Sequence, residues 1–255
     1  MLAVTRKSKI KELILEKKSV TVSELSKLFT VTEETIRRDL KLLEDEGILT
    51  RTYGGAYVQD GVQNDISINI RENLYVSSKE VIANQCATLI NHGDSIFLDS
   101  STTSLFIATK VREKRITVIT NSLKVANTLA DAESVRLILI GGVLATSSMS
   151  FLGRSALNTM QSFYVDKAFI SCRSVSLEHG VTDSNEQQAE FRQLAIKRAN
   201  KVYLVVDHTK INKTSFTNIC SFDEIDAIVI DSKLDNAWHE HMAEHQVEII
   251  ESNMQ

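Results

Sequence analysis

The apolar residues of segment 32–44 recur at helical spacing. Ile36, Leu40 and Leu43 lie four and three positions apart, so in a helix they share one face. Thr32 is a residue type that caps helix N-termini. The pattern predicts an amphipathic helix, and its outer face carries Glu34, Arg37, Arg38 and Lys41.

Two shorter apolar patterns precede this segment and predict helices over residues 6–18 and 23–29. Thr21 and Glu24 have the separation of a capping box at the start of the second helix. Residues 30–32 then form a link of the length found in helix-turn-helix motifs. In such a motif the second helix lies in the major groove of DNA, with its N-terminal residues at the base edges.

A strand-like run with a tight turn follows these helices. Residues 48–53 are strand-like, the pair 54–55 is Gly-Gly, and residues 56–58 can return beside the first strand. The pattern predicts a β-wing that places Arg51 near a DNA phosphate.

The helix and the wing together predict a DNA interface. Its expected members are Thr32, Glu34, Thr35, Arg37, Arg38, Lys41 and Arg51. We expect Arg38 to read a base, and Thr35 and Arg51 to contact phosphates. Taken alone, the charged helix face is more typical of an ordinary solvated helix. The preceding helix and the following hairpin are what favour DNA binding.

From residue 77 onward, short apolar runs alternate with amphipathic segments. Strands are predicted over residues 95–98, 116–120, 135–140, 168–171, 202–206, 227–230 and 247–250. Helices are predicted over residues 77–90, 103–111, 123–130, 185–200 and 236–244. Buried strands separated by helices indicate an α/β domain with a Rossmann-like, mostly parallel sheet. The expected domains are residues 1–58 and 77–255, joined by a linker over residues 59–76.

Small polar residues end several of the predicted strands. Ligands of parallel sheets bind at the carboxyl ends of strands, and helix N-termini bind anions. A phosphate or sugar site is therefore expected from Asp99, Ser100, Ser101, Thr102, Thr103, Thr120, Asn121, Ser122, Gly141 and Gly142. In the alternative interpretation, the hydroxyls of these loops only cap helices. The serine-rich residues 146–150 are predicted to form a loop, which in one interpretation covers this site.

The charge distribution fits this division of the chain. The formal net charge is −4, but residues 1–58 contain 11 Lys and Arg against 9 Asp and Glu. The N-terminus lacks the apolar run of a signal peptide, and no run is long enough to span a membrane. Three widely separated cysteines form neither a disulfide framework nor a zinc pattern. We expect a cytoplasmic protein that needs no metal or cofactor.

Several fixed spacings in the first part of the chain carry a family resemblance. Residues 35–40, 47–49 and 54–56 resemble the winged helix-turn-helix of the DeoR family of bacterial transcription regulators. Tyr53 stands where that family usually has histidine. The rest of the chain resembles the family's sensor domain, which is similar in fold to ribose-phosphate isomerase. The matching motifs are residues 98–103, 120–122, 141–142, 180–182 and 207–210.

The resemblance implies a regulator of a carbohydrate operon, with repression as the expected mode. It also implies that a phosphorylated sugar alters DNA binding. Asp183, Asn185, Glu186 and Lys210 are further candidates for that effector site.

Two positions depart from the family pattern. Ser101 replaces a loop glycine, and Arg173 stands where the family commonly has aspartate. A guanidinium binds a carboxylate or a second phosphate, so one hypothesis is a phosphorylated sugar acid. The alternative is that Arg173 pairs internally with Asp183 or Glu186.

Other functions stay open at this point. A sugar-phosphate isomerase with an accessory DNA-binding domain would use Asp183 or Glu186 as base and Lys210 as electrophile. However, no decisive catalytic pair is present, and we assign no catalytic residue. A DNA architectural protein is a weaker alternative.

Double-stranded operator DNA is the expected partner, and a symmetric dimer or tetramer is expected. His241 and His245 have a metal-binding spacing but lack a third ligand.

Overall fold

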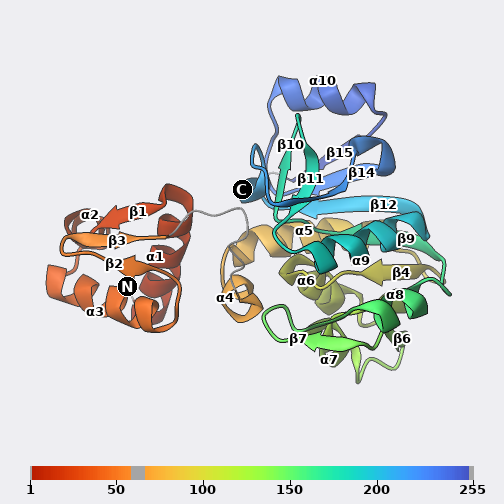
Figure 1. Ribbon diagram of the computed structural model, residues 1–255, viewed down its shortest axis with the longest axis horizontal. Helices are drawn as coiled ribbons and strands as arrows, with labels where there is room; N and C mark the ends of the chain where they lie inside the picture. The colour runs from red at the N-terminus through yellow and green to blue at the C-terminus, as the bar shows by residue number, and fades with distance from the viewer. Residues whose placement is uncertain (1, 59–66, 253–255) are drawn as a thin grey trace. The chain divides into compact units, whose positions relative to one another are not determined.

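The computed structural model describes residues 2–58 and 67–252. The chain divides into two compact units, residues 1–75 and residues 76–255, which we call the head and the body (Figure 1).

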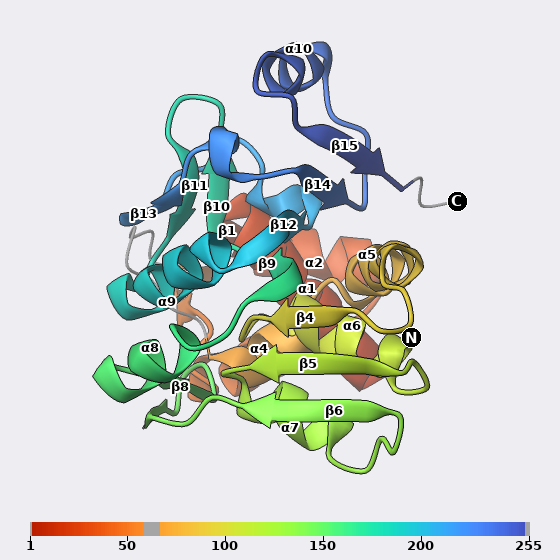
Figure 2. The ribbon, with the colours of Figure 1, turned by 90° about the vertical axis from the view of Figure 1, so that its right-hand side faces the viewer.

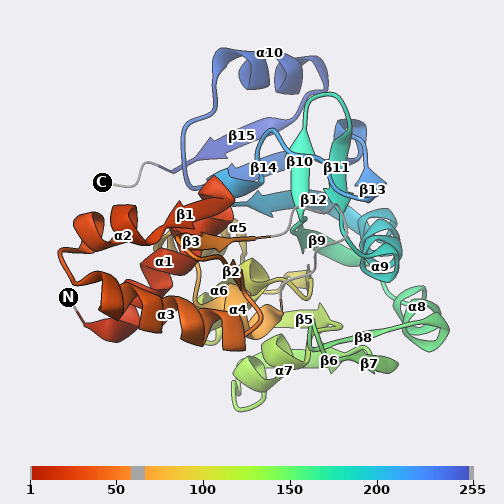
Figure 3. The same cartoon turned by 60° about the vertical axis from the view of Figure 1, so that its left-hand side comes forward.

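The head contains the predicted helix-turn-helix (Figure 3). Its helices are α1 (Ala3–Lys17), α2 (Val22–Phe29) and α3 (Glu33–Asp45). α2 begins at the predicted capping box, since the Thr21 hydroxyl accepts from the Glu24 N–H and the Glu24 carboxylate accepts from the Thr21 N–H. α3 begins after the Thr32 cap and ends at Asp45. Gly47 follows the C-cap residue Glu46, and its φ of 72° allows the Ile48 N–H to donate back to the Leu43 carbonyl.

A three-stranded antiparallel sheet completes the wing. β3 (Gly55–Tyr57) lies between β1 (Ser19–Thr21) and β2 (Thr50–Arg51). The wing was predicted, but β1 was not. A Cβ at Gly55 would lie 2.1 Å from the Val20 carbonyl oxygen, so β3 approaches β1 this closely only because residue 55 has no side chain.

The apolar stripes of α1 and α3 meet in the core of the head, where Ile10, Ile14, Ile36, Leu40 and Leu43 are buried. This result confirms the helical pattern that was read from the sequence.

A further short helix, α4 (Ile68–Glu72), also belongs to the head. The Ser8 hydroxyl donates to the Asn73 carbonyl at 3.1 Å, and the Glu12 carboxylate accepts from the Tyr75 N–H at 2.9 Å. The expected linker over residues 59–76 therefore includes a helix that is fastened to α1. Its first part, residues 59–66, lies outside the described residues.

The body is built on a seven-stranded sheet in which every pairing is parallel (Figure 2). The strand order is β15-β14-β12-β9-β4-β5-β6. The strands are β4 (Ser95–Leu98), β5 (Ile116–Thr120), β6 (Val135–Leu139), β9 (Val165–Ile170), β12 (Ala199–Val206), β14 (Ala227–Ile230) and β15 (Glu248–Glu251). All seven predicted strands are present, so the predicted α/β class is confirmed.

Helices cover both faces of the sheet. α5 (Val76–Leu89), α6 (Thr102–Val111) and α7 (Leu123–Leu129) pack on one face. α8 (Arg154–Met160), α9 (Glu186–Lys197) and α10 (Asn236–Glu244) contribute to the core on the other face. Alternate residues of one strand serve the two cores, since Ile96 and Leu98 face the first and Phe97 faces the second. α9 is shorter than predicted because β12 begins at residue 199.

Two small sheets were not predicted. β7 (Val143–Ala145) and β8 (Ser150–Leu152) form an antiparallel hairpin, and the serine-rich loop that we expected is its tip. β10 (Ser174–Ser176), β11 (Gly180–Asp183) and β13 (Thr217–Cys220) form the other sheet. Two short 3-10 helices, η1 (His208–Lys210) and η2 (Phe222–Glu224), complete the body.

Candidate functional site

The outer face of α3 is exposed, as predicted. Glu34, Arg37, Arg38 and Lys41 all lie on the surface. At the start of the helix the Thr32 hydroxyl accepts from the Thr35 N–H at 3.3 Å. These side chains therefore form one accessible helix face, as a groove-reading helix requires.

The cations of this face differ in their surroundings. Arg37 forms an ion pair with Glu33 one turn earlier, at 2.9 Å. Arg38 and Lys41 form no hydrogen bond or ion pair with any residue in the described parts of the chain. Their positive charge is therefore not neutralised within the head, and it is available to a polyanion.

Arg51 of the wing is held by α3. Its backbone N–H donates to Glu44 at 2.8 Å, and its Nε donates to the same carboxylate at 2.6 Å. These two hydrogen bonds lower the pKa of Glu44, and the bond from the backbone N–H has the larger effect. The pairing fixes the wing against α3. The predicted phosphate contact of Arg51 would have to compete with Glu44.

A buried ion pair joins α1 to α3. Arg6 Nε lies 2.6 Å from Asp39 Oδ2, and both side chains are almost inaccessible to solvent. Neither residue was predicted to have a role. The pair sets the position of α3, and therefore of its outer face.

In the body, Asp99 organises the loop that follows β4. One carboxylate oxygen accepts from the Ser101 N–H at 2.9 Å and the Ser104 hydroxyl at 2.6 Å. The other accepts from the Ser171 N–H at 3.0 Å and Arg192 Nε at 2.8 Å. Burial alone would raise the pKa of Asp99, but Arg192 and the other donors lower it below its usual value.

Arg192 of α9 connects this loop to β11. Besides Asp99, the guanidinium pairs with Asp183, and all three side chains are buried. Burial would lower the pKa of Arg192, but the two carboxylates raise it, so the residue stays cationic. Both predicted site residues, Asp99 and Asp183, are thus engaged in an internal ion triad.

The hydroxyls of the Asp99 loop fall into two groups. The Ser101 hydroxyl caps α6 by accepting from the Ser104 N–H at 3.0 Å, as the alternative interpretation expected. The hydroxyls of Thr102 and Thr103, in the first turn of α6, have no hydrogen-bond partner among the described residues. The two threonines can therefore donate to a ligand.

The loop after β5 also contains both kinds of group. The Thr120 hydroxyl donates to the Leu98 carbonyl at 2.7 Å, and the Ser122 hydroxyl caps α7. The Asn121 amide donates to the Phe151 carbonyl at 3.1 Å, but its buried Oδ1 has no partner within the described chain. Thr120 and Ser122 have local structural roles, whereas Asn121 retains an unused acceptor.

Gly141 and Gly142 lead into the β7–β8 hairpin. A Cβ at Gly142 would lie 2.6 Å from the Leu152 carbonyl oxygen, so glycine is needed for the close approach of the two hairpin ends. The hairpin is fastened to the loop after β5, since the Phe151 N–H donates to the Asn121 carbonyl at 2.8 Å.

The remaining predicted site residues lie at the start of α9, after β9 and in η1. Asn185 caps α9, Glu186 is exposed, and Lys210 Nζ lies 3.9 Å from Asp207. Arg173 is half-buried, and its guanidinium has no hydrogen bond or ion pair with any described residue. The internal pair of Arg173 with Asp183 or Glu186 is therefore not observed.

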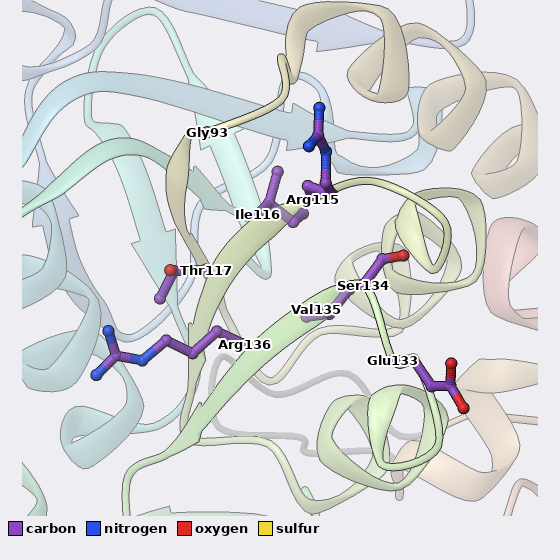
Figure 4. Close-up of a pocket in the computed structure, with 8 residues that line it drawn as sticks. All are labelled: Gly93, Arg115, Ile116, Thr117, Glu133, Ser134, Val135 and Arg136. Carbon is purple, nitrogen blue, oxygen red and sulfur yellow. The ribbon is translucent and has the colours of Figure 1, made fainter.

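A pocket of about 360 Å³ lies at the opposite edge of the sheet, at the amino ends of β5 and β6 (Figure 4). Its lining residues are Gly93, Arg115, Ile116, Thr117, Glu133, Ser134, Val135 and Arg136. The guanidinium groups of Arg115 and Arg136 point away from each other in Figure 4. Because its cations do not converge, the pocket is a poor fit to a single anion.

The three cysteines are free and buried. Within residues 2–58 and 67–252, no cluster of three metal-ligating side chains occurs. In the same ranges, no helix has the length and apolar character to cross a membrane.

Two family models match the chain, one in its N-terminal part and one in the body. The family model described as the DeoR-like helix-turn-helix domain matches residues 6–61, and the DeoR C-terminal sensor domain matches residues 75–232. The chain belongs to the DeoR family. It is a DNA-binding transcription regulator.

Several curated relatives of this DeoR-family chain match almost end to end. The uncharacterised HTH-type transcriptional regulator YulB of Bacillus subtilis is 37% identical over 98% of this chain and 96% of its own. A putative aga operon transcriptional repressor of Escherichia coli O157:H7 is 33% identical over 96% and 92%. The lactose phosphotransferase system repressor of Staphylococcus aureus is 33% identical over 89% and 91%. All three are regulators, so the isomerase alternative is not supported.

Three residues that shape the candidate sites of this DeoR-family regulator were not predicted from its sequence. Asp39, Gln188 and Arg192 all lie in predicted helices, but the sequence pattern assigned none of them a role. Gln188 and Arg192 are one helical turn apart on α9, on the side that faces the Asp99 loop. That spacing was the available signal, but their partners lie 88 and 93 residues away in the sequence.

Proposed function

We propose that the protein regulates a carbohydrate operon, as a repressor, and that a phosphorylated sugar or sugar acid changes its affinity for the operator. Two observations carry the proposal. The outer face of α3 is exposed and carries Arg37, Arg38 and Lys41, and the first turn of α6 has two hydroxyls without a hydrogen-bond partner among the described residues. Relatives named as an aga operon repressor and a lactose phosphotransferase system repressor support the class of operon.

In the head, Arg38 is the residue assigned to base reading. Its guanidinium is exposed and is not paired with any described residue, so no internal ion pair must break when it binds a base edge. Thr35 and Arg51 are assigned to phosphates, while Thr32, Glu34, Arg37 and Lys41 complete the interface.

The DNA assignment is tested with Arg38→Ala in the full chain. Loss of one good base contact costs about 1–3 kcal/mol, which is roughly a tenfold to hundredfold loss of affinity for the specific site. The assay is fluorescence anisotropy on an operator selected from random duplexes. Arg154→Ala, which removes an exposed arginine from the body, is the control. Equal affinity of Arg38→Ala and this control would reject the assignment.

In the body, the phosphate is assigned to the first turn of α6. The hydroxyls of Thr102 and Thr103 and the unpaired N–H groups of a helix N-terminus suit an anion. Buried Asn121 Oδ1 suits a ligand hydroxyl, because a buried acceptor without a donor costs free energy. Asp99 and Asp183 are assigned the role of positioning the loop after β4 and strand β11, because both carboxylates are paired with Arg192.

Arg173 and Lys210 are assigned to a second anionic group of the effector. The guanidinium of Arg173 has no partner in the described part of the chain, which supports a role in ligand binding. Arg173→Ala should therefore weaken a phosphorylated sugar acid more than a neutral sugar phosphate. Equal weakening of both would support a phosphorylated sugar as the effector and would reject a phosphorylated sugar acid.

Thermal-shift measurements on Thr102→Val test the phosphate assignment. The substitution removes a hydroxyl at nearly constant volume. The apparent affinity for hexose and pentose phosphates should fall by at least threefold, because a lost hydrogen bond costs about 1 kcal/mol. Thr109→Val, at the exposed end of the same helix, is the control. The assignment fails if Thr102→Val behaves as the control does.

For the effector to regulate transcription, the two units must be coupled. We assign this coupling to a symmetric dimer or tetramer that spaces two heads on a repeated operator. Sedimentation analysis with and without operator DNA would measure the oligomeric state. A monomer bound to a single half-site would overturn this part of the proposal.

A further inference from the structure

Gln188 lies where three segments of the body meet. Its Oε1 accepts from the Ser100 hydroxyl at 2.8 Å, and its Nε2 donates to the Ser148 hydroxyl at 2.9 Å and the Ser150 hydroxyl at 2.8 Å. Gln188 belongs to the first turn of α9, Ser100 to the loop after β4, and the two other serines to the β7–β8 hairpin. A single carboxamide therefore connects a helix, a loop and a hairpin that are distant in the sequence.

The cluster is buried and consists of neutral groups. Gln188, Ser100, Ser148 and Ser150 are each at most 7% exposed. Hydroxyl groups donate and accept, so each can exchange partners. A sugar hydroxyl replaces any of these hydrogen bonds without leaving a buried polar group unpaired, whereas an alkyl group does not. The chemistry of the cluster therefore suits a polyhydroxylated ligand.

Asn121 supplies an independent observation in the same place. Its Oδ1 is buried and has no donor among the described residues, and its Nδ2 donates to the carbonyl of Phe151, the neighbour of Ser150. Nearly all buried acceptors in proteins are satisfied, so an unsatisfied one next to a hydroxyl cluster indicates a place where a ligand hydroxyl donates.

We propose that Gln188, Ser148, Ser150 and Asn121 form a subsite that reads the hydroxyl groups of the effector, and that Gln188 determines its specificity. This inference rests on the proposed function, which assigns the anionic group to the first turn of α6. The subsite explains how the body distinguishes a sugar phosphate from phosphate itself. It also gives the β7–β8 hairpin a role, since the hairpin supplies two of the four side chains.

The test uses Gln188→Met in the full chain, with Gln187→Met as the matched control. Gln187 is the adjacent residue of the same helix and is exposed. The probes are inorganic phosphate, hexyl phosphate, and a set of hexose 6-phosphates and pentose 5-phosphates, with binding measured by calorimetry. In the wild type and the control, the best sugar phosphate should bind at least about tenfold more tightly than either simple phosphate. In Gln188→Met that ratio should fall below about threefold, with the affinity for inorganic phosphate unchanged.

A second variant covers the case in which Gln188→Met does not fold. Ser148→Ala removes one hydroxyl from the hairpin and should lower the same ratio by roughly threefold to tenfold. The inference is overturned if folded Gln188→Met or Ser148→Ala retains the full ratio. If no phosphate compound binds the wild type, the result rejects the proposed sugar-phosphate effector, and the subsite is rejected with it. If Thr102→Val loses binding while Gln188→Met keeps the ratio, only the inference fails.

Discussion

Removal of the buried Asp39 carboxylate should strongly destabilise the head while the stability of the body stays unchanged. Asp39 and Arg6 form a 2.6 Å ion pair between α3 and α1, and their side chains are only 3% and 6% exposed. In Asp39→Ala the Arg6 guanidinium would remain buried without its partner. An unpaired buried charge is strongly destabilising, whereas a complete replacement of such a pair by apolar residues is not.

The expected loss follows from this burial. Breaking a buried pair by removing one partner costs about 3–5 kcal/mol. At roughly 0.05–0.15 kcal/mol per residue, the 75-residue head has a free energy of unfolding of roughly 4–11 kcal/mol. Asp39→Ala should therefore remove a large part of that stability, and specific DNA binding should be lost with it.

The chain provides a spectroscopic separation of the two units. Its single tryptophan, Trp238, is buried in the body, so urea unfolding followed by tryptophan fluorescence reports the body alone. Circular dichroism reports both units. In Asp39→Ala the early part of the dichroism transition should move to lower urea while the fluorescence transition stays in place.

Two controls sharpen this experiment. Asp45→Ala removes an exposed carboxylate from the same helix and should change the stability of the head by less than about 0.5 kcal/mol. The double variant Arg6→Met with Asp39→Leu should recover most of the lost stability, because it removes both buried charges. Equal stability of Asp39→Ala and Asp45→Ala, or a double variant less stable than Asp39→Ala, would show that the buried ion pair does not stabilise the head in this way.

Gly55→Ala should destabilise the wing by about 1–3 kcal/mol, because the added Cβ would lie 2.1 Å from the Val20 carbonyl oxygen. Gly54→Ala is the control and should be nearly neutral, because a Cβ there has no neighbour within 4 Å. Equal unfolding curves for the two variants would contradict this prediction. The folded pKa of Asp99 lies below its usual value, so its stabilisation of the body is present above about pH 4 and is lost as the pH falls towards the folded pKa. Fluorescence-detected unfolding between pH 3 and 7 should therefore show a smaller acid loss in Asp99→Asn than in the wild type. Glu44→Gln should free Arg51 for DNA and raise operator affinity by roughly twofold to tenfold at low salt, with a steeper salt dependence in anisotropy titrations; unchanged affinity would remove Arg51 from the interface.

The periodic parts of the fold could be predicted from the sequence because each carries its own local signal. The stripe of Ile36, Leu40 and Leu43, the Thr21–Glu24 capping box and the short apolar strands all depend on residues within one element. β1 was missed because its three residues are too few for a period to be visible. The helix α4 was missed because only five residues are helical and its attachment to α1 is made by residues more than 60 positions away.

The candidate sites were predictable at the level of loops but not of individual roles. The sequence placed polar groups at strand ends, and the structure brings the loops after β4 and β5 together with the hairpin. It could not show that Asp99 forms an ion pair with Arg192, or that Asn121 Oδ1 has no hydrogen-bond donor among the described residues. Those roles depend on which distant side chain satisfies each buried group, and no local pattern encodes that choice.

The most direct test of the account is a titration of selected operator DNA with the full-length protein, with and without each sugar phosphate of the panel. At least one compound should change the operator affinity by about fivefold or more, and operator DNA should change the affinity for that compound by the same factor. If every compound that binds the body leaves the operator affinity unchanged, the proposed link between sugar-phosphate sensing and DNA binding is contradicted.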